Sequence, residues 1–138
     1  MTHAVSDVDR SAPARRVHRI EVWMRPDEID PAGDTARREA QQRLGPVETV
    51  RTARLYLIEA PLDDAQIQRI ADELLADAVS QTATLGTADR NERTRLIEVH
   101  YQPGVMDPVA QSTRDAITEM LPELSPDDVQ VRTGQRYD

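Results

Sequence analysis

Two aspartates, Asp30 and Asp107, each stand directly before a proline. Paired carboxylates are what general acid–base chemistry uses, so these two are the first candidates for a catalytic role. The proline favours another interpretation. An aspartate at a helix N-cap accepts a hydrogen bond from a free N–H of the first turn, and proline suits the first helical position. We therefore predict that Asp30-Pro31 and Asp107-Pro108 begin two helices and that neither aspartate is catalytic.

Other residue types that support chemistry are scarce. His18 and His100 fall in predicted strands, and neither has an acidic residue or a second histidine at ligand spacing, so no metal site is predicted. The chain has no cysteine, which excludes a thiolate nucleophile and a disulfide framework. Neither GxGxxG nor GK[ST] occurs, so no phosphate-binding loop is predicted. The sequence predicts no catalytic residue.

Three residues are candidates for a partner interface. Trp23 stands on the polar side of an alternating segment, and an exposed aromatic there is typical of an interface, with core packing as the alternative. Arg51 and Arg132 recur in two similar Val-Arg-Thr segments, where they could face a partner subunit or only solvent.

The two Asp-Pro pairs belong to an internal repeat. Residues 20–31 and 97–108 align without gaps, and six of the twelve aligned residues are identical. Each copy contains an apolar–polar alternation, then a proline, then Asp-Pro, which predicts a strand, a turn and a helix. A strand–helix–strand unit is therefore predicted to occur twice, with Gly104 allowing a positive φ in the second turn.

The remaining pattern predicts an α+β fold whose mainly antiparallel sheet has helices on one face. The predicted strands are 17–25, 47–59 with an irregularity near Ala53, 80–85, 96–101 and one beginning at 131. The predicted helices are 31–44, 63–78 with a capping box between Asp63 and Gln66, and 108–121. An alanine stripe (Ala32, Ala36, Ala40) ending at Leu44 predicts that the first helix lies close to the sheet.

These elements divide the chain into four parts. Residues 1–16 show no period and are predicted to form a disordered tail. The first unit is 17–86, a polar linker is 87–94, and the second unit is 95–138. That second unit lacks counterparts of the helix and strand that complete the first one, so it is incomplete: it is either a reduced unit or part of a longer chain.

Composition excludes some classes of partner. Lys plus Arg number 17 and Asp plus Glu number 25, which gives a formal charge of −8. Nucleic acids and anionic membranes attract a concentrated positive field, so neither is expected as a partner. No apolar run is long enough to span a bilayer and no secretory signal is visible, so the expected location is the cytoplasm. With no Phe and 3% aromatic residues, the core is aliphatic and modest, and self-association is expected to add stability.

The order of these motifs resembles PurS, the small subunit of phosphoribosylformylglycinamidine synthase. The matching features are Arg19-Ile20-Glu21-Val22, Pro26, Asp30-Pro31 with Gly33, a helix ending in Leu44-Gly45, and Val50-Arg51-Thr52. The second unit is similar at Pro103-Gly104-Val105 and Asp107-Pro108. It departs from the family at Ala110, where a glycine would stand, and in a longer turn at 122–128. The whole resembles two PurS-like units fused, as in the N-terminal domain of synthase large subunits.

The resemblance implies a function. The whole enzyme would be a C–N ligase that converts formylglycinamide ribonucleotide, glutamine and ATP to the amidine in purine biosynthesis, with ATP and Mg²⁺ used outside this segment. The chain itself would carry no cofactor and would bridge a synthetase and a glutaminase. The alternative is a stand-alone regulatory or dimerisation module that binds a small metabolite between its units, because small α+β folds host many functions.

Overall fold

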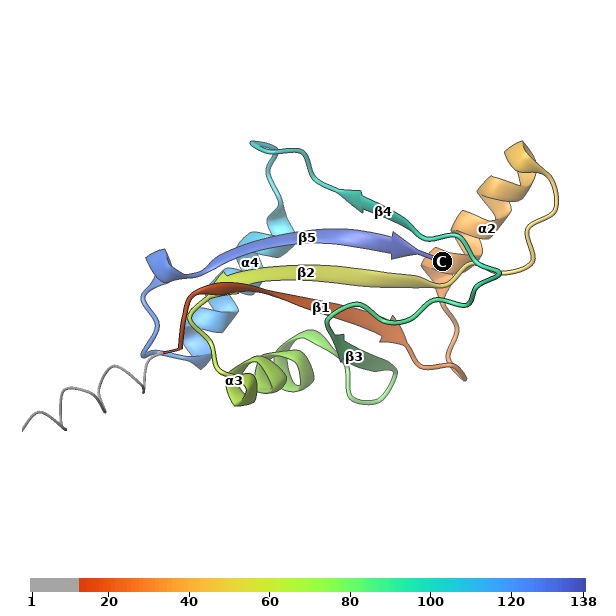
Figure 1. The fold of residues 1–138 in the computed structure, drawn as a ribbon. Coiled ribbons are helices and arrows are strands. Elements are labelled where there is room, and N and C mark those ends of the chain that lie inside the picture. The colour runs from red at the N-terminus through yellow and green to blue at the C-terminus, as the bar shows by residue number, and fades with distance from the viewer. Residues whose placement is uncertain (1–12) are drawn as a thin grey trace, which may run out of the picture.

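The protein is described here by a computed structural model that covers residues 13–138. Five antiparallel strands form one sheet in the order β3-β1-β2-β5-β4 (Figure 1). The strands are β1 (Arg16–Met24), β2 (Thr52–Ala60), β3 (Gln81–Leu85), β4 (Ile97–His100) and β5 (Gln130–Tyr137). The helical segments are α2 (Pro31–Leu44), α3 (Asp64–Arg69), the π-helix η1 (Ile70–Leu75), α4 (Pro108–Met120) and the 3-10 helix η2 (Pro126–Asp128). The predicted α+β class with an antiparallel sheet is confirmed.

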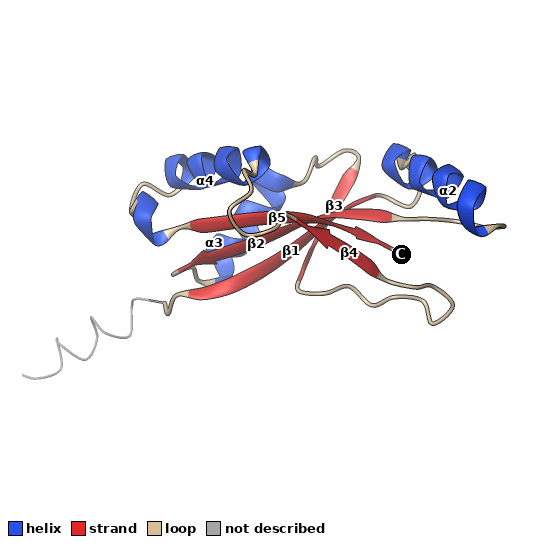
Figure 2. Ribbon diagram, turned by 90° about the horizontal axis from the view of Figure 1, so that it is seen from above, coloured by secondary structure: helices blue, strands red, loops and turns tan. Residues whose placement is uncertain are grey.

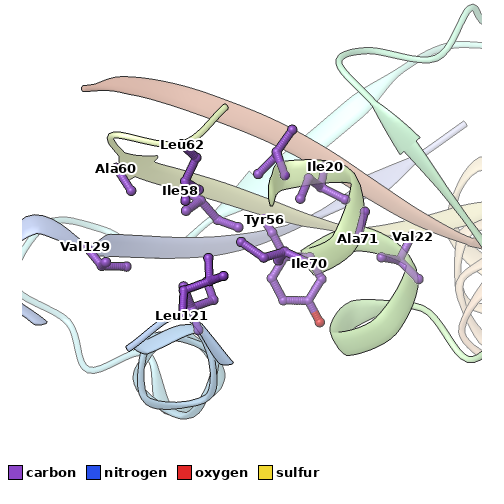
Figure 3. Close-up of a cluster of buried hydrophobic side chains, with 12 residues drawn as sticks. Ile20, Val22, Tyr56, Ile58, Ala60, Leu62, Ile70, Ala71, Leu121 and Val129 are labelled. Atoms are coloured by element: carbon purple, nitrogen blue, oxygen red, sulfur yellow. The ribbon is translucent and has the colours of Figure 1, made fainter. Parts of the chain in front are cut away.

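The core lies where helices cover one face of the sheet. Alternate residues of β1 and β2 point to this face, so Ile20 and Ile58 are fully buried there. Ile70 of η1 and Ile117 of α4 pack against them, and both are also fully buried. Figure 3 shows the same cluster between the strands and the two helices. We call this side the helix face.

The opposite face of the sheet is covered differently. The segment between β3 and β4 crosses it on the side away from α4, as Figure 2 shows. This segment was predicted to be a linker, and it contains no helix or strand. Its Ala88 bonds to Glu21 of β1 and Arg136 of β5, so the segment seals charged side chains against the sheet. We call this side the linker face.

The two strand–helix–strand units have matching registers. Trp23 pairs with Ala53 in the first unit, and His100 pairs with Gly134 in the second. Residues of β1 and α2 correspond to the residues of β4 and α4 that lie 77 positions later in the sequence. Residues of β2 correspond to the residues of β5 that lie 81 positions later. The difference is the longer turn that contains η2. The correspondence supports the predicted repeat.

The centre of this correspondence lies between β2 and β5. Arg54 of β2 pairs directly with Gln135 of β5. Gln135 is also the residue of the second unit that corresponds to Arg54 of the first unit. A pseudo-twofold axis therefore passes between these two residues, perpendicular to the sheet. Around it the first unit contributes β1 and β2, and the second contributes β4 and β5.

Helix α2 differs from its counterpart α4. The prediction that its small-residue stripe lies close to the sheet is wrong, because Gly33 is its one buried residue and Leu44 is 82% exposed. Figures 1 and 2 show α2 extending past the ends of the strands. The reason is volume: where α4 buries Ile117, α2 has Ala40 and gains little by packing.

Two further predictions need correction. Ala53 lies in a regular register with both neighbouring strands, so β2 has no irregularity there and begins only at Thr52. The helix predicted to reach residue 78 ends earlier, because it widens into η1 at Ile70 and stops at Leu75. Ala78 is consequently exposed. The predicted disordered tail ends one residue too late, because β1 begins at Arg16, and residues 1–12 lie outside the described part.

The predicted helix starts are confirmed. Asp30 caps α2, with Pro31 in its first turn, and Asp107 caps α4, with Pro108 in the same place. The capping box is present too, because Asp63 accepts from the Gln66 N–H at 2.8 Å and its own N–H donates to the Gln66 side chain at 2.9 Å. Gly104 has φ 84°, as predicted for its turn.

Gly33 is expected to be the least replaceable residue of α2. A Cβ there would lie 2.3 Å from the Val50 carbonyl oxygen, whereas the corresponding Ala110 of α4 has room for its side chain. Gly33→Ala should lower the free energy of unfolding by about 1–3 kcal/mol, because the backbone must shift to admit the methyl group. Urea unfolding followed by circular dichroism measures this, with Ala110→Gly as the matched control, expected to cost about 0.5–1 kcal/mol. If Gly33→Ala were as stable as the wild type, the backbone at Val50 would have to move away from the added methyl group at no cost in free energy.

Candidate functional site

Each predicted helix-start aspartate is also a clamp between a helix and a strand. Asp30 accepts from the Gly33 N–H at 2.9 Å, from the Thr52 N–H at 2.8 Å and from the Thr52 hydroxyl. Asp107 does the same with Ala110 and Thr133, at 2.9 Å for each N–H. The carboxylate oxygens therefore join the start of each helix to the second strand of the same unit. Their role is structural.

The ionisation of Asp107 reflects this geometry. Burial of its carboxylate disfavours the charged form, but hydrogen bonds from the Ala110 N–H and from Thr133 outweigh that effect. With the nearby positive charge of Arg54, they hold the pKa of Asp107 below its ordinary value. A carboxylate held ionised in this way accepts hydrogen bonds and is a poor general acid near neutral pH.

A cleft opens on the helix face, beside the pseudo-twofold axis. Its largest part encloses about 550 Å³ between the start of α2, the strands and η1. A smaller part of about 230 Å³ continues toward β4 and α4. Arg54 and Gln135 line both parts, so the central residue pair of the sheet forms the floor of the cleft.

Arg54 and Tyr56 are among the polar residues that line this cleft. Among residues 13–138 the Arg54 guanidinium has no ion-pair partner. The Tyr56 ring is 6% exposed, and Figure 3 shows its hydroxyl pointing away from the sheet. An unpaired guanidinium is suited to a carboxylate or phosphate. Sequence patterns did not single out Arg54, because its neighbours meet only across the paired strands.

The linker face holds a buried ionic cluster. Glu21 and Arg136 are both fully buried, and the two atoms Arg136 Nη1 and Glu21 Oε2 lie 2.9 Å apart. Arg19 donates to Glu21 at 2.6 Å and also pairs with Glu98 of β4. Burial disfavours the charged form of Glu21, but the Ala88 N–H and the two guanidinium groups lower its pKa below the ordinary value. This cluster joins the two units.

The structure separates the three predicted interface residues. Trp23 is 6% exposed, with its indole N–H 3.3 Å from Glu21, so the ring is buried within the chain and is not a surface anchor. The Arg51 guanidinium carbon lies 5.0 Å from the centre of that ring, and Arg136 lies at 5.1 Å. Arg132, on the linker face, is exposed. Arg51 and Arg132 are both exposed, but Arg51 lies against the Trp23 ring.

The histidines lie apart. His18 is buried near the start of β1, and burial lowers its pKa, with further lowering from Arg16. His100 lies on edge strand β4 with its Nε2 3.2 Å from Glu98. Within residues 13–138 no group of three or more histidine, aspartate or glutamate side chains could hold a metal ion. None of the helices in that range is long and apolar enough to cross a membrane.

Fold and cleft together define, over residues 13–138, an α+β sheet with two segments of matching register, an open cleft between them and an edge strand, β4, that pairs on one side only. No protein-family model matches the chain, and no curated protein or solved structure matches it either. The function is therefore argued from the geometry and from the resemblance in sequence order.

Proposed function

We propose that this chain is a non-catalytic assembly module of the PurS type, which bridges the synthetase and glutaminase parts of phosphoribosylformylglycinamidine synthase. The observation that carries this proposal is the repeated aspartate clamp. Asp30 with Thr52 and Asp107 with Thr133 make the same bonds on two sides of a pseudo-twofold axis. Two PurS-like units fused into one chain would have this arrangement.

The distribution of polar groups supports a structural role. The carboxylates with lowered pKa values, Glu21, Glu98 and Asp107, each accept hydrogen bonds from the chain itself. A general acid or base needs a pKa near the working pH and a free path to substrate. These three groups satisfy neither requirement, so they hold the fold together.

The test is reconstitution with the synthetase and the glutaminase of the same organism. Sedimentation of the three proteins with ADP and glutamine should give a complex that contains this chain, and amidine synthesis should depend on the chain. Arg132→Ala is the most informative variant, because Arg132 is exposed and its replacement leaves the core unchanged. Arg51 is less suitable because it contacts the buried Trp23. Arg38→Ala, also exposed but on α2, is the matched control. A synthetase and glutaminase that associate and work fully without the chain would refute the proposal.

A second candidate function is regulatory binding of a small anionic metabolite in the cleft. The unpaired Arg54 on the floor of the 550 Å³ hollow favours it. Calorimetry with amino acids and nucleotides should then detect a ligand whose binding is lost in Arg54→Ala and kept in Arg38→Ala. Binding that survives Arg54→Ala would remove this candidate.

A further inference from the structure

Among residues 13–138, no strand pairs with the outer edge of β4. It is the last strand of the sheet and pairs with β5 on one side only. In the corresponding strand β1, the Arg19 carbonyl accepts from the Gly86 N–H and the Arg25 N–H donates to Ser80, so its odd-numbered residues bond outward, toward the β3 side. The matching registers give Glu98 and His100 the same role in β4. Their backbone N–H and C=O groups therefore face the free edge.

The same strand leaves apolar side chains uncovered on the helix face. Ile97 is 59% exposed and Val99 is 55% exposed, and Tyr101 just beyond the strand is 50% exposed. Their counterparts in β1, Ile20 and Val22, are 0% and 6% exposed because η1 and β3 cover them. An edge without lysine, proline or a bulge is open to pairing with another strand.

We propose that β4 is the dimerisation edge of this protein, pairing antiparallel with β4 of a second copy about a twofold axis at Val99. The residues on each side of Val99 favour this register. Glu98 lies opposite His100 of the second copy, so the Glu98–His100 contact that each chain already makes can extend across the axis. Ile97 lies opposite Tyr101 of the second copy, so apolar side chains meet on the helix face. A register centred on Glu98 would instead place two carboxylates opposite each other.

This pairing closes on itself. A twofold contact uses the same patch on both copies, so association stops at a dimer with one continuous sheet. Pairing of β4 with the other sheet edge, β3, would join different patches and produce longer assemblies. The outward groups of Glu98 and His100 form the new ladder bonds, because in a twofold pair centred on Val99 they face each other.

Sedimentation of the whole chain tests the proposal. The wild type should give a species of twice the 15.5 kDa chain mass. Val99→Lys should weaken the dimer on the order of a hundredfold, because two like charges then face each other across the axis. Leu44→Lys is the matched control, since Leu44 is 82% exposed on α2, and it should leave the dimer unchanged. A wild type that stays monomeric, or a dimer that tolerates Val99→Lys, would overturn the proposal.

Mixing two variants of opposite charge distinguishes a defect in strand pairing from a defect in folding. Val99→Glu alone should also be monomeric, but mixing it with Val99→Lys should restore a dimer of one copy of each, which a folding defect would not do. Register is tested by Val99→Cys in this cysteine-free chain. Cα atoms in such a non-hydrogen-bonded pair are about 4.5 Å apart, within disulfide range. Mild oxidation should crosslink Val99→Cys and not Leu44→Cys; no crosslink would refute the Val99-centred register.

These experiments use the chain alone. Their outcome is therefore independent of the bridging function, which needs the synthetase and the glutaminase. Species larger than a dimer would indicate β3–β4 pairing and would refute the twofold contact.

Discussion

Glu21→Ala is expected to lower the free energy of unfolding by about 3 kcal/mol, because the buried Arg136 guanidinium loses one of its two carboxylate partners and keeps only Asp138. Glu21 and Arg136 are both fully buried, and Glu21 accepts hydrogen bonds from Arg136, from Arg19 and from the Ala88 N–H. The free energy of unfolding of a domain of this size is about 5–15 kcal/mol, so the variant should lose a large part of its stability.

The double variant Glu21→Leu with Arg136→Leu identifies the cause. If the loss comes from the charge left on Arg136, replacing both partners by apolar residues should recover part of the stability, since Asp138 then loses its own pair with Arg136. If it comes from lost volume alone, the double variant should be no better than Glu21→Ala. Urea unfolding, with the fluorescence of the single Trp23 as the reporter, measures both. Glu59→Ala is the control: its pair with Arg15 is 39% exposed, and its loss should cost about 0–1 kcal/mol.

The same carboxylate predicts a pH dependence. The pKa of Glu21 is lowered in the folded chain, so its charged form adds stability above its ordinary value of 4.5. That contribution is lost as the pH falls through the lowered folded-state value. Wild-type stability should therefore decrease below about pH 4.5, and Glu21→Gln should show a smaller decrease over the same range. Equal slopes for the two proteins would contradict the assignment.

Asp107→Ala is expected to cost about 2–4 kcal/mol, of which about 1 kcal/mol is the lost helix cap and the rest two unsatisfied donors. The N–H and hydroxyl of Thr133 both donate to Asp107, and Thr133 is 5% exposed. Water therefore reaches these groups poorly once the carboxylate is gone. Because α4 buries Ile117 against the sheet, loosening its first turn should weaken the whole core.

Asp30→Ala is the matched comparison. Asp30 makes the same set of bonds to Gly33 and Thr52, but α2 has only Gly33 buried. Its loss should therefore cost less than that of Asp107, and hydrogen exchange should show opening confined to α2. Chemical denaturation of both variants decides this. A larger loss for Asp30→Ala would mean that α2 supports the core more than its exposure indicates.

Local chemistry explains which features could be predicted. Asp30-Pro31, Asp107-Pro108 and the Asp63–Gln66 box act within one helical turn, so the residues that form each cap lie within a few positions of one another. The alternation of apolar and polar residues predicted the strands because it too is a pattern among neighbouring residues. The wrong predictions concern features that depend on contacts between residues far apart in the sequence. They are the end of the helix at Leu75, the regular register at Ala53 and the exposure of α2.

By itself the sequence determined the caps, the five strands and the antiparallel α+β class. Only the tertiary structure decided that Trp23 is buried, that Glu21 meets Arg136, and that Arg54 lies on the floor of a cleft. It also decided that the apolar side of β4 is uncovered. Burial depends on which residues meet across the sheet, and Glu21 and Arg136 are 115 positions apart. No local pattern records a contact at that separation.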